Sequence, residues 1–180
     1  MGYDLLVKNG TVIDGSGSPG YRADVGVVGG KIAAIGRINE SANQTIDADG
    51  HIVSPGFVDG HTHMDAQIFW DPIGSCSCYH GVTSVVMGNC GFTLAPCKQE
   101  DADMDFRNLE RAEDLSRDAM LEGIDWRWET FPEFLDVLDE LPKGINYAGY
   151  IGDSAFRTYV MGESAFSDAA SEDDVRNMQG

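Results

Sequence analysis

The run from Ser54 to His63 ends in two histidines, and it limits what this chain can fold into more than any other stretch. An apolar segment after a Pro-Gly pair predicts a buried strand over residues 57–61. Side chains two apart on a strand point to the same face, so His61 and His63 can aim their imidazoles at one point. Two such imidazoles are typical first ligands of a transition metal. The run therefore predicts a strand whose carboxyl end carries part of a metal site.

Composition narrows the range of partners. The chain has 180 residues, of which 30 are acidic and 12 basic, giving a net charge of −18. Without a basic patch to neutralise phosphate, we expect neither nucleic acid nor an anionic membrane surface as a partner. No apolar run approaches the length of a membrane span.

Cysteine usage bears on the compartment. There are four cysteines and nothing that resembles a secretory signal at the amino terminus. We therefore predict a cytoplasmic protein whose thiols are reduced and available for metal or catalytic chemistry.

Residues 1–54 are predicted to form a small β domain of sandwich type. Glycine-containing turns separate short β-prone runs, and this pattern is typical of hairpins. The expected hairpins join 3–8 to 11–14 through Asn9-Gly10, 23–28 to 31–35 through Gly29-Gly30, and 44–47 to 51–53 through Ala48-Asp49-Gly50.

Residues 55–180 are predicted to alternate strands with helices, which indicates βα units and a parallel sheet. The expected strands are 57–61, 81–87 and 146–151, and the expected helices are 71–79, 103–121, 131–140 and one that begins after Ser171. The fold class is thus α/β, the start of a TIM-like (β/α) barrel preceded by a small β domain. A complete barrel needs roughly 200 to 250 residues, so we expect both domains to be incomplete in this chain.

Cys90 extends the predicted metal site. In parallel α/β folds the functional side chains gather at the carboxyl ends of the strands. His61 and His63 end one expected strand, and Cys90 comes just after the next one. A thiolate beside two imidazoles suits zinc. We therefore expect His61, His63 and Cys90 to meet in a zinc site; the alternative for Cys90 is a small buried apolar residue.

Other polar residues have more than one interpretation. Asp59 and Asp65 flank the histidines and could orient an imidazole or cap a turn. Arg157, after the last expected strand, is a candidate for binding a substrate carboxylate through its planar guanidinium, and an ordinary surface ion pair is the alternative.

Several motifs together resemble a known family. The run from Val53 to His63 is similar to the metal-site opening of the amidohydrolase superfamily. Further motifs resemble those of the N-acyl-D-amino-acid deacylases, or D-aminoacylases: Phe69-Trp70-Asp71-Pro72, His80-Gly81-Val82-Thr83, Val86 to Phe92 and Arg157 to Glu163. The resemblance runs through nearly all of the chain and corresponds to the amino-terminal part of such an enzyme.

The resemblance implies a β-sandwich attached to a TIM-like barrel that holds zinc. It implies metal-ligand roles for His61, His63 and Cys90, and hydrolysis of an N-acyl-D-amino acid by a metal-activated water. Two further histidine ligands and the aspartate that serves as general acid/base would lie beyond Gly180. We therefore expect the 180-residue chain alone to be inactive.

One departure and two alternatives stay open. The family commonly has Gly-His-Ser where this chain has Gly152-Asp153-Ser154, which bears on any role near Arg157. A cyclic-amide hydrolase, such as a hydantoinase or dihydropyrimidinase, shares the H-x-H opening but typically bridges two metals with a modified lysine. The other alternative is an inactive, truncated metal-binding fragment.

Overall fold

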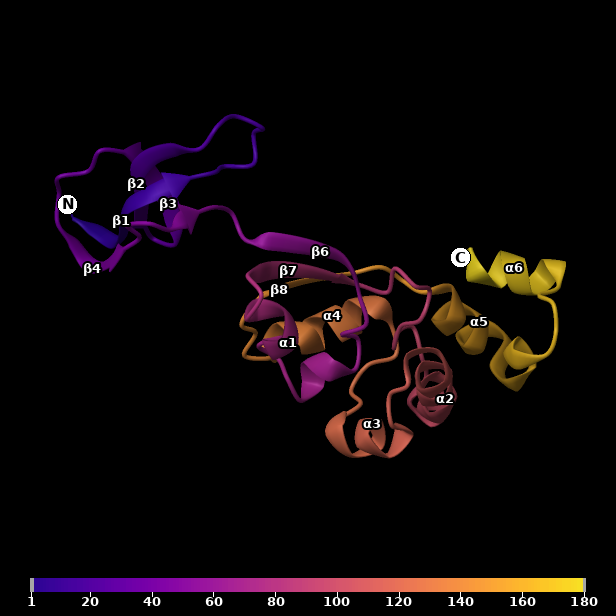
Figure 1. The fold of residues 1–180 in the computed structure, drawn as a ribbon. Coiled ribbons are helices and arrows are strands. Elements are labelled where there is room, and N and C mark those ends of the chain that lie inside the picture. Colours follow the sequence, from indigo (N-terminus) through magenta and orange to yellow (C-terminus); the bar gives the residue numbers. More distant parts are fainter. Residues whose placement is uncertain (1, 180) are drawn as a thin grey trace. The chain divides into compact units, whose positions relative to one another are not determined.

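A computed structural model describes residues 2–179, which Figure 1 traces from indigo to yellow. The chain divides into two compact units between Pro55 and Gly56. Within the described residues, no helix is long and apolar enough to cross a bilayer.

The first unit is a single sheet built around its first strand. Its strands are β1 (Tyr3–Val12), β2 (Tyr21–Val28), β3 (Lys31–Gly36), β4 (Ala42–Asp47) and β5 (Ile52–Val53). The strand order is β3-β2-β1-β4, and β5 also pairs with β1. The pairs β1–β2 and β2–β3 are antiparallel, whereas β4 and β5 run parallel to β1. The hairpin through Gly29-Gly30 is therefore confirmed.

The hairpin predicted at Asn9-Gly10 is wrong, because β1 continues through both residues. Asn9 has a φ of 62°, the left-handed conformation that a turn would also need. It lies where the pairing of β1 with β2 shifts register, and its N–H donates to Asp24 Oδ1 at 2.9 Å. The left-handed residue therefore makes a bulge and not a turn.

The third predicted hairpin is also wrong, because β4 and β5 each pair with β1 and not with each other. Gly10 permits this arrangement. A Cβ added to Gly10 would lie 2.4 Å from Val53 Cγ2 and 3.4 Å from Ala48 Cβ. The missing side chain lets both residues pack directly on β1.

The second unit alternates strands with helices, as predicted. Its strands are β6 (Phe57–Thr62), β7 (Val82–Met87) and β8 (Asn146–Gly149), in that order and all parallel. Its α-helices are α1 (Ser75–Cys78), α2 (Ala102–Glu113), α3 (Arg117–Gly123), α4 (Phe131–Glu140), α5 (Asp153–Met161) and α6 (Glu172–Met178). Short 3₁₀ turns are η1 (Gln67–Phe69), η2 (Gln99–Asp101) and η3 (Gly162–Phe166).

The core of this unit is one buried cluster to which the sheet, α2, α3 and α4 all contribute, and α4 runs alongside the strands (Figure 1). Val85 and Met87 of β7 are each 1% exposed and join one buried cluster with Phe134 of α4. The prediction that β6 is a buried strand is wrong at its start: Phe57 is 66% and Val58 70% exposed. β6 is an edge strand of the described sheet, and the side chains at its start are open to solvent.

The helix predicted over residues 103–121 is two helices. α2 ends where Asp114 adopts a φ of 57°, and α3 begins after Ser116, whose hydroxyl accepts a hydrogen bond from the Ala119 N–H. The helix predicted over residues 131–140 is confirmed as α4, and a capping box formed by Thr130 and Glu133 begins it. The helix expected over 71–79 is only the four residues of α1, and the strand expected over 146–151 ends at Gly149.

A buried carboxylate links α2 to α5. Asp105 is 1% exposed, and the Thr158 hydroxyl donates to its Oδ1 at 2.8 Å. Its Oδ2 has no hydrogen-bond partner among residues 2–179. Burial raises the pKa of Asp105 to about 7. A folded pKa above the unfolded value means that the group stabilises the fold below about pH 4, and that this contribution is lost as pH rises through about 7.

We predict that Asp105→Asn removes this pH dependence. The amide keeps an oxygen that can accept the Thr158 hydroxyl and cannot ionise. The parent should lose about 3 kcal/mol of stability between pH 5 and pH 8 through this group, and the variant should not. Urea unfolding at the two pH values measures the difference, with the exposed Asp136→Asn as the control. An unchanged pH profile in Asp105→Asn would contradict the assignment.

Candidate metal site

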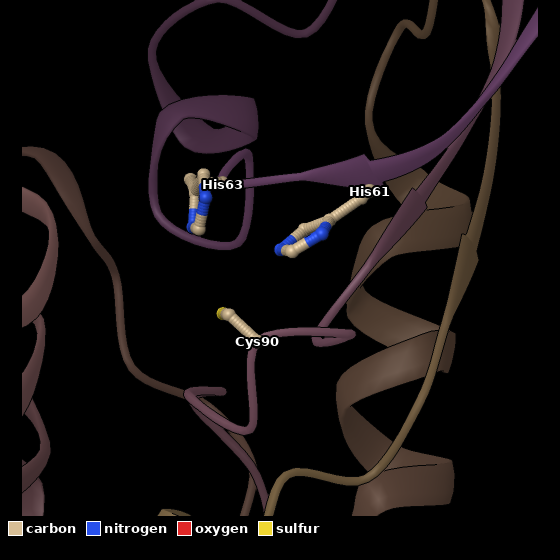
Figure 2. A group of neighbouring side chains, drawn as sticks. All are labelled: His61, His63 and Cys90. Atoms are coloured by element: carbon tan, nitrogen blue, oxygen red, sulfur yellow. The ribbon is translucent and has the colours of Figure 1, made fainter.

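The structure brings His61, His63 and Cys90 together. His61 lies in β6, His63 just after it, and Cys90 in the loop after β7. One donor atom from each can be chosen so that all three lie within 4.8 Å of one another, and the two imidazole centroids are 5.2 Å apart. Figure 2 shows the three side chains pointing into a common space.

The parallel pairing of β6 with β7 fixes this position. Thr62 pairs with Met87, and the Thr62 hydroxyl donates to the Val86 carbonyl at 2.9 Å. Beyond the strand ends, the Asn89 side-chain amide donates to the Gly60 carbonyl at 3.3 Å. Because Thr62 is buried, the strand alternation exposes His61 on the opposite side.

Two glycines shape the loop that presents Cys90. Gly88 has a φ of 79° and Gly91 a φ of 92°. A Cβ on Gly88 would lie 2.6 Å from the Tyr150 carbonyl oxygen, whereas one on Gly91 would meet nothing within 4 Å. The loop therefore lies close to the residues that follow β8, and at Gly88 there is no room for a side chain.

Glu113, the last residue of α2, also belongs to the site and was not predicted from the sequence. Its side chain is only 3% exposed. Its Oε1 lies 2.7 Å from His63 Nδ1 and 3.3 Å from Cys90 Sγ. In the sequence Glu113 is one of many acidic residues, and it lies inside a predicted helix. The one signal that could have distinguished it is the end of the helix at Asp114.

The two aspartates beside the histidines differ in role. Asp59 Oδ1 accepts a hydrogen bond from the His61 backbone N–H at 3.2 Å, so it caps the chain locally. Asp65 is 1% exposed, and its Oδ2, like Glu113 Oε2, has no hydrogen-bond partner among residues 2–179. Burial, and then the charge of Glu113, raises the pKa of Asp65 to about 8.

These residues fit a divalent metal ion by their chemistry. Two imidazoles and a thiol are zinc donors. Burial raises the pKa of the Cys90 thiol, and Glu113 beside it raises that pKa further. A cation at this point would favour the thiolate and would offset the charge of the two orphaned carboxylates.

A pocket of about 280 Å³ adjoins Cys90 and is also lined by Asp153 and Arg157. The Arg157 Nη2 donates to the carbonyls of Ala165 at 3.1 Å and Asp168 at 2.9 Å. Through these hydrogen bonds Arg157 stabilises the segment after α5. Its side chain also lines the pocket beside Cys90. The carboxylate of Asp153 lines the same space.

Sequence comparison gives the first functional context. Residues 44–180 match the sequence model of a family described as "Amidohydrolase family". A D-aminoacylase of Alcaligenes xylosoxydans xylosoxydans is 38% identical over 178 residues, which are 98% of this chain and 34% of that protein. The chain thus spans about a third of the length of this relative.

Comparison with solved structures gives the same functional context as the sequence comparison. An N-acyl-D-glutamate deacylase of Bordetella bronchiseptica, in complex with zinc and a phosphonate inhibitor, matches with a TM-score of 0.80 at 30% identity, over 99% of this chain and 35% of that one. A D-aminoacylase studied for its binuclear metal centre matches with a TM-score of 0.81 at 37% identity, over 98% of this chain and 35% of that one. These matches confirm the predicted α/β fold class, with its β unit ahead of the first barrel-type strands.

We predict that Gly88→Ala is more destabilising than Gly91→Ala. Both changes place a side chain in a left-handed conformation, at a cost of about 1 to 2 kcal/mol. Only Gly88→Ala also forces Cβ against the Tyr150 carbonyl, which should add about 1 to 3 kcal/mol. Free energies of unfolding in urea measure both variants. Equal costs would show that the loop has room to shift.

Proposed function

The chain belongs to the amidohydrolase family, and on this premise we propose that the protein hydrolyses the amide bond of N-acyl-D-amino acids. The observation that carries the proposal is the meeting of His61, His63 and Cys90 at the carboxyl edge of β6 and β7. The similarity to deacylases of N-acyl-D-amino acids along nearly the whole chain supports this substrate class.

We propose that His61, His63 and Cys90 hold zinc. Bound there, zinc would supply a Lewis acid for the amide carbonyl and would lower the pKa of a coordinated water. The imidazoles and the thiol are suitable donors, and the phosphonate complex of the Bordetella bronchiseptica deacylase contains zinc. The general acid/base is proposed to be an aspartate that this chain does not include.

We also propose the domain plan and location. Residues 1–54 would be the amino-terminal part of a β-sandwich, and residues 55–180 the first βα units of a TIM-like barrel in the whole protein. The parallel order β6-β7-β8 supports this plan. A cytoplasmic location is supported by the four cysteines, all of which are free thiols.

The cyclic-amide alternative has less support. It requires a lysine beside the metal ligands. Lys143 lies ahead of β8, at the amino end of that strand, where its ammonium donates to the Leu138 carbonyl. Lys8 lies in the first unit and donates to the Ile38 carbonyl. Lys143 is therefore at the opposite end of its strand from the carboxyl edge where His61, His63 and Cys90 meet.

We predict that the full-length protein binds zinc and hydrolyses N-acyl-D-amino acids but not their L enantiomers. A chiral substrate panel with zinc analysis measures both properties. Cys90→Ser should weaken zinc binding by at least about 100-fold and abolish turnover, because the hydroxyl is a far weaker donor than a thiolate. Cys76→Ser, at an exposed thiol, is the matched control and should change neither property. A protein that binds zinc but hydrolyses no N-acyl-D-amino acid would refute the proposal.

We further propose that Arg157 contributes to binding of the substrate carboxylate, because it borders the pocket beside Cys90. The carboxylate of Asp153 lines the same pocket and would repel a substrate carboxylate. The contribution of Arg157 to binding therefore depends on the planar geometry of its guanidinium rather than on the net charge of the pocket.

Arg157→Lys should therefore raise KM by about tenfold with a smaller change in kcat. Steady-state kinetics on the full-length protein measure the two constants, and the exposed Arg111→Lys is the control. An unchanged KM would limit Arg157 to its contacts with the Ala165 and Asp168 carbonyls.

A further inference from the structure

A buried carboxylate lies against two of the three proposed zinc ligands. Glu113 Oε1 lies 2.7 Å from His63 Nδ1 and 3.3 Å from Cys90 Sγ, and the Glu113 side chain is 3% exposed. We propose that Glu113 is a positioning residue, which holds the His63 imidazole in the orientation and tautomer that bind the metal. This inference rests on the zinc site proposed above.

The proposal assigns the proton on His63. In it, Nδ1 carries the proton and donates to Glu113 Oε1 across the 2.7 Å contact, because an ionised carboxylate only accepts hydrogen bonds. In a neutral imidazole the lone pair is then on Nε2, the nitrogen left for the metal. Metal-binding histidines commonly need such a partner, and its loss typically costs 10–100-fold in metal affinity.

The distances favour positioning over direct ligation. Two donors around one tetrahedral zinc ion are separated by about 3.3 Å, given zinc–donor bonds of about 2.0 to 2.1 Å. The separation of 2.7 Å between Glu113 Oε1 and His63 Nδ1 is instead an ordinary hydrogen-bond distance. The contact between Glu113 Oε1 and His63 Nδ1 is therefore a hydrogen bond rather than a pair of donors to one ion.

The placement of Glu113 is unfavourable for folding alone, which argues for a role in the site. It ends α2, where the helix dipole disfavours a negative charge, and Asp114 stops the helix with a φ of 57°. Its Oε2 is buried without a hydrogen-bond partner among residues 2–179, and Asp65 nearby is buried in the same condition. A side chain that served packing only would be better neutral.

The test compares two substitutions of similar size in the full-length protein. Glu113→Leu removes the acceptor, and Glu113→Gln keeps a neutral one. Zinc dissociation constants are measured by competition with a chromophoric chelator, and thermal unfolding is measured on the metal-free forms. Glu122→Leu, at an exposed glutamate in α3, is the control.

We expect Glu113→Leu to bind zinc 10–100-fold more weakly, while its metal-free form unfolds at the same or a higher temperature. Glu113→Gln should keep zinc affinity within a few-fold of the parent. Equal affinity in parent and Glu113→Leu would overturn the inference, as would equal losses in the Leu and Gln variants. A joint fall in zinc affinity and metal-free stability would assign Glu113 a structural role and also overturn it. A parent protein that binds no zinc would instead refute the zinc site itself.

Discussion

The site depends first on the parallel pairing of β6 with β7. The register that places Thr62 opposite Met87 turns the Thr62 hydroxyl inward to the Val86 carbonyl and leaves His61 on the other side. A slip of one residue would exchange the two faces and bury the imidazole. The same pairing brings the loop that carries Cys90 to the end of β6. One backbone register thus decides whether the three proposed zinc donors meet.

Electrostatics at this edge work against the metal-free fold. Asp65 and Glu113 are both buried with an unpartnered oxygen, and the pKa of Asp65 is raised to about 8. The pKa of the Cys90 thiol is raised as well, chiefly by burial. Each of these groups would be better accommodated beside a cation. A metal ion that binds only the folded state would therefore raise the free energy of unfolding and offset the destabilisation caused by the buried acidic groups.

Local signals in the sequence were sufficient for much of this outcome. The helix over residues 131–140 and the alternation of strands and helices depend on neighbours a few residues apart, and both were predicted. The prediction of a hairpin at Asn9-Gly10 was wrong because a left-handed asparagine is compatible with a bulge as well as with a turn. The contact that favours the bulge is the hydrogen bond from the Asn9 N–H to Asp24, which is distant in the sequence. Glu113 was missed for a related reason: its contact with His63 joins residues 50 positions apart.

Asp105 and Glu113 show how burial of similar groups leads to different chemistry. Both lie on α2 with one carboxylate oxygen unpartnered among the described residues. Asp105 accepts a hydroxyl from Thr158 and can become neutral by binding a proton, as its raised pKa of about 7 indicates. Glu113 instead faces His63 and Cys90, two groups that can bind a metal. The neighbours of each carboxylate, rather than its depth, therefore determine whether a proton or the proposed metal site would compensate its charge.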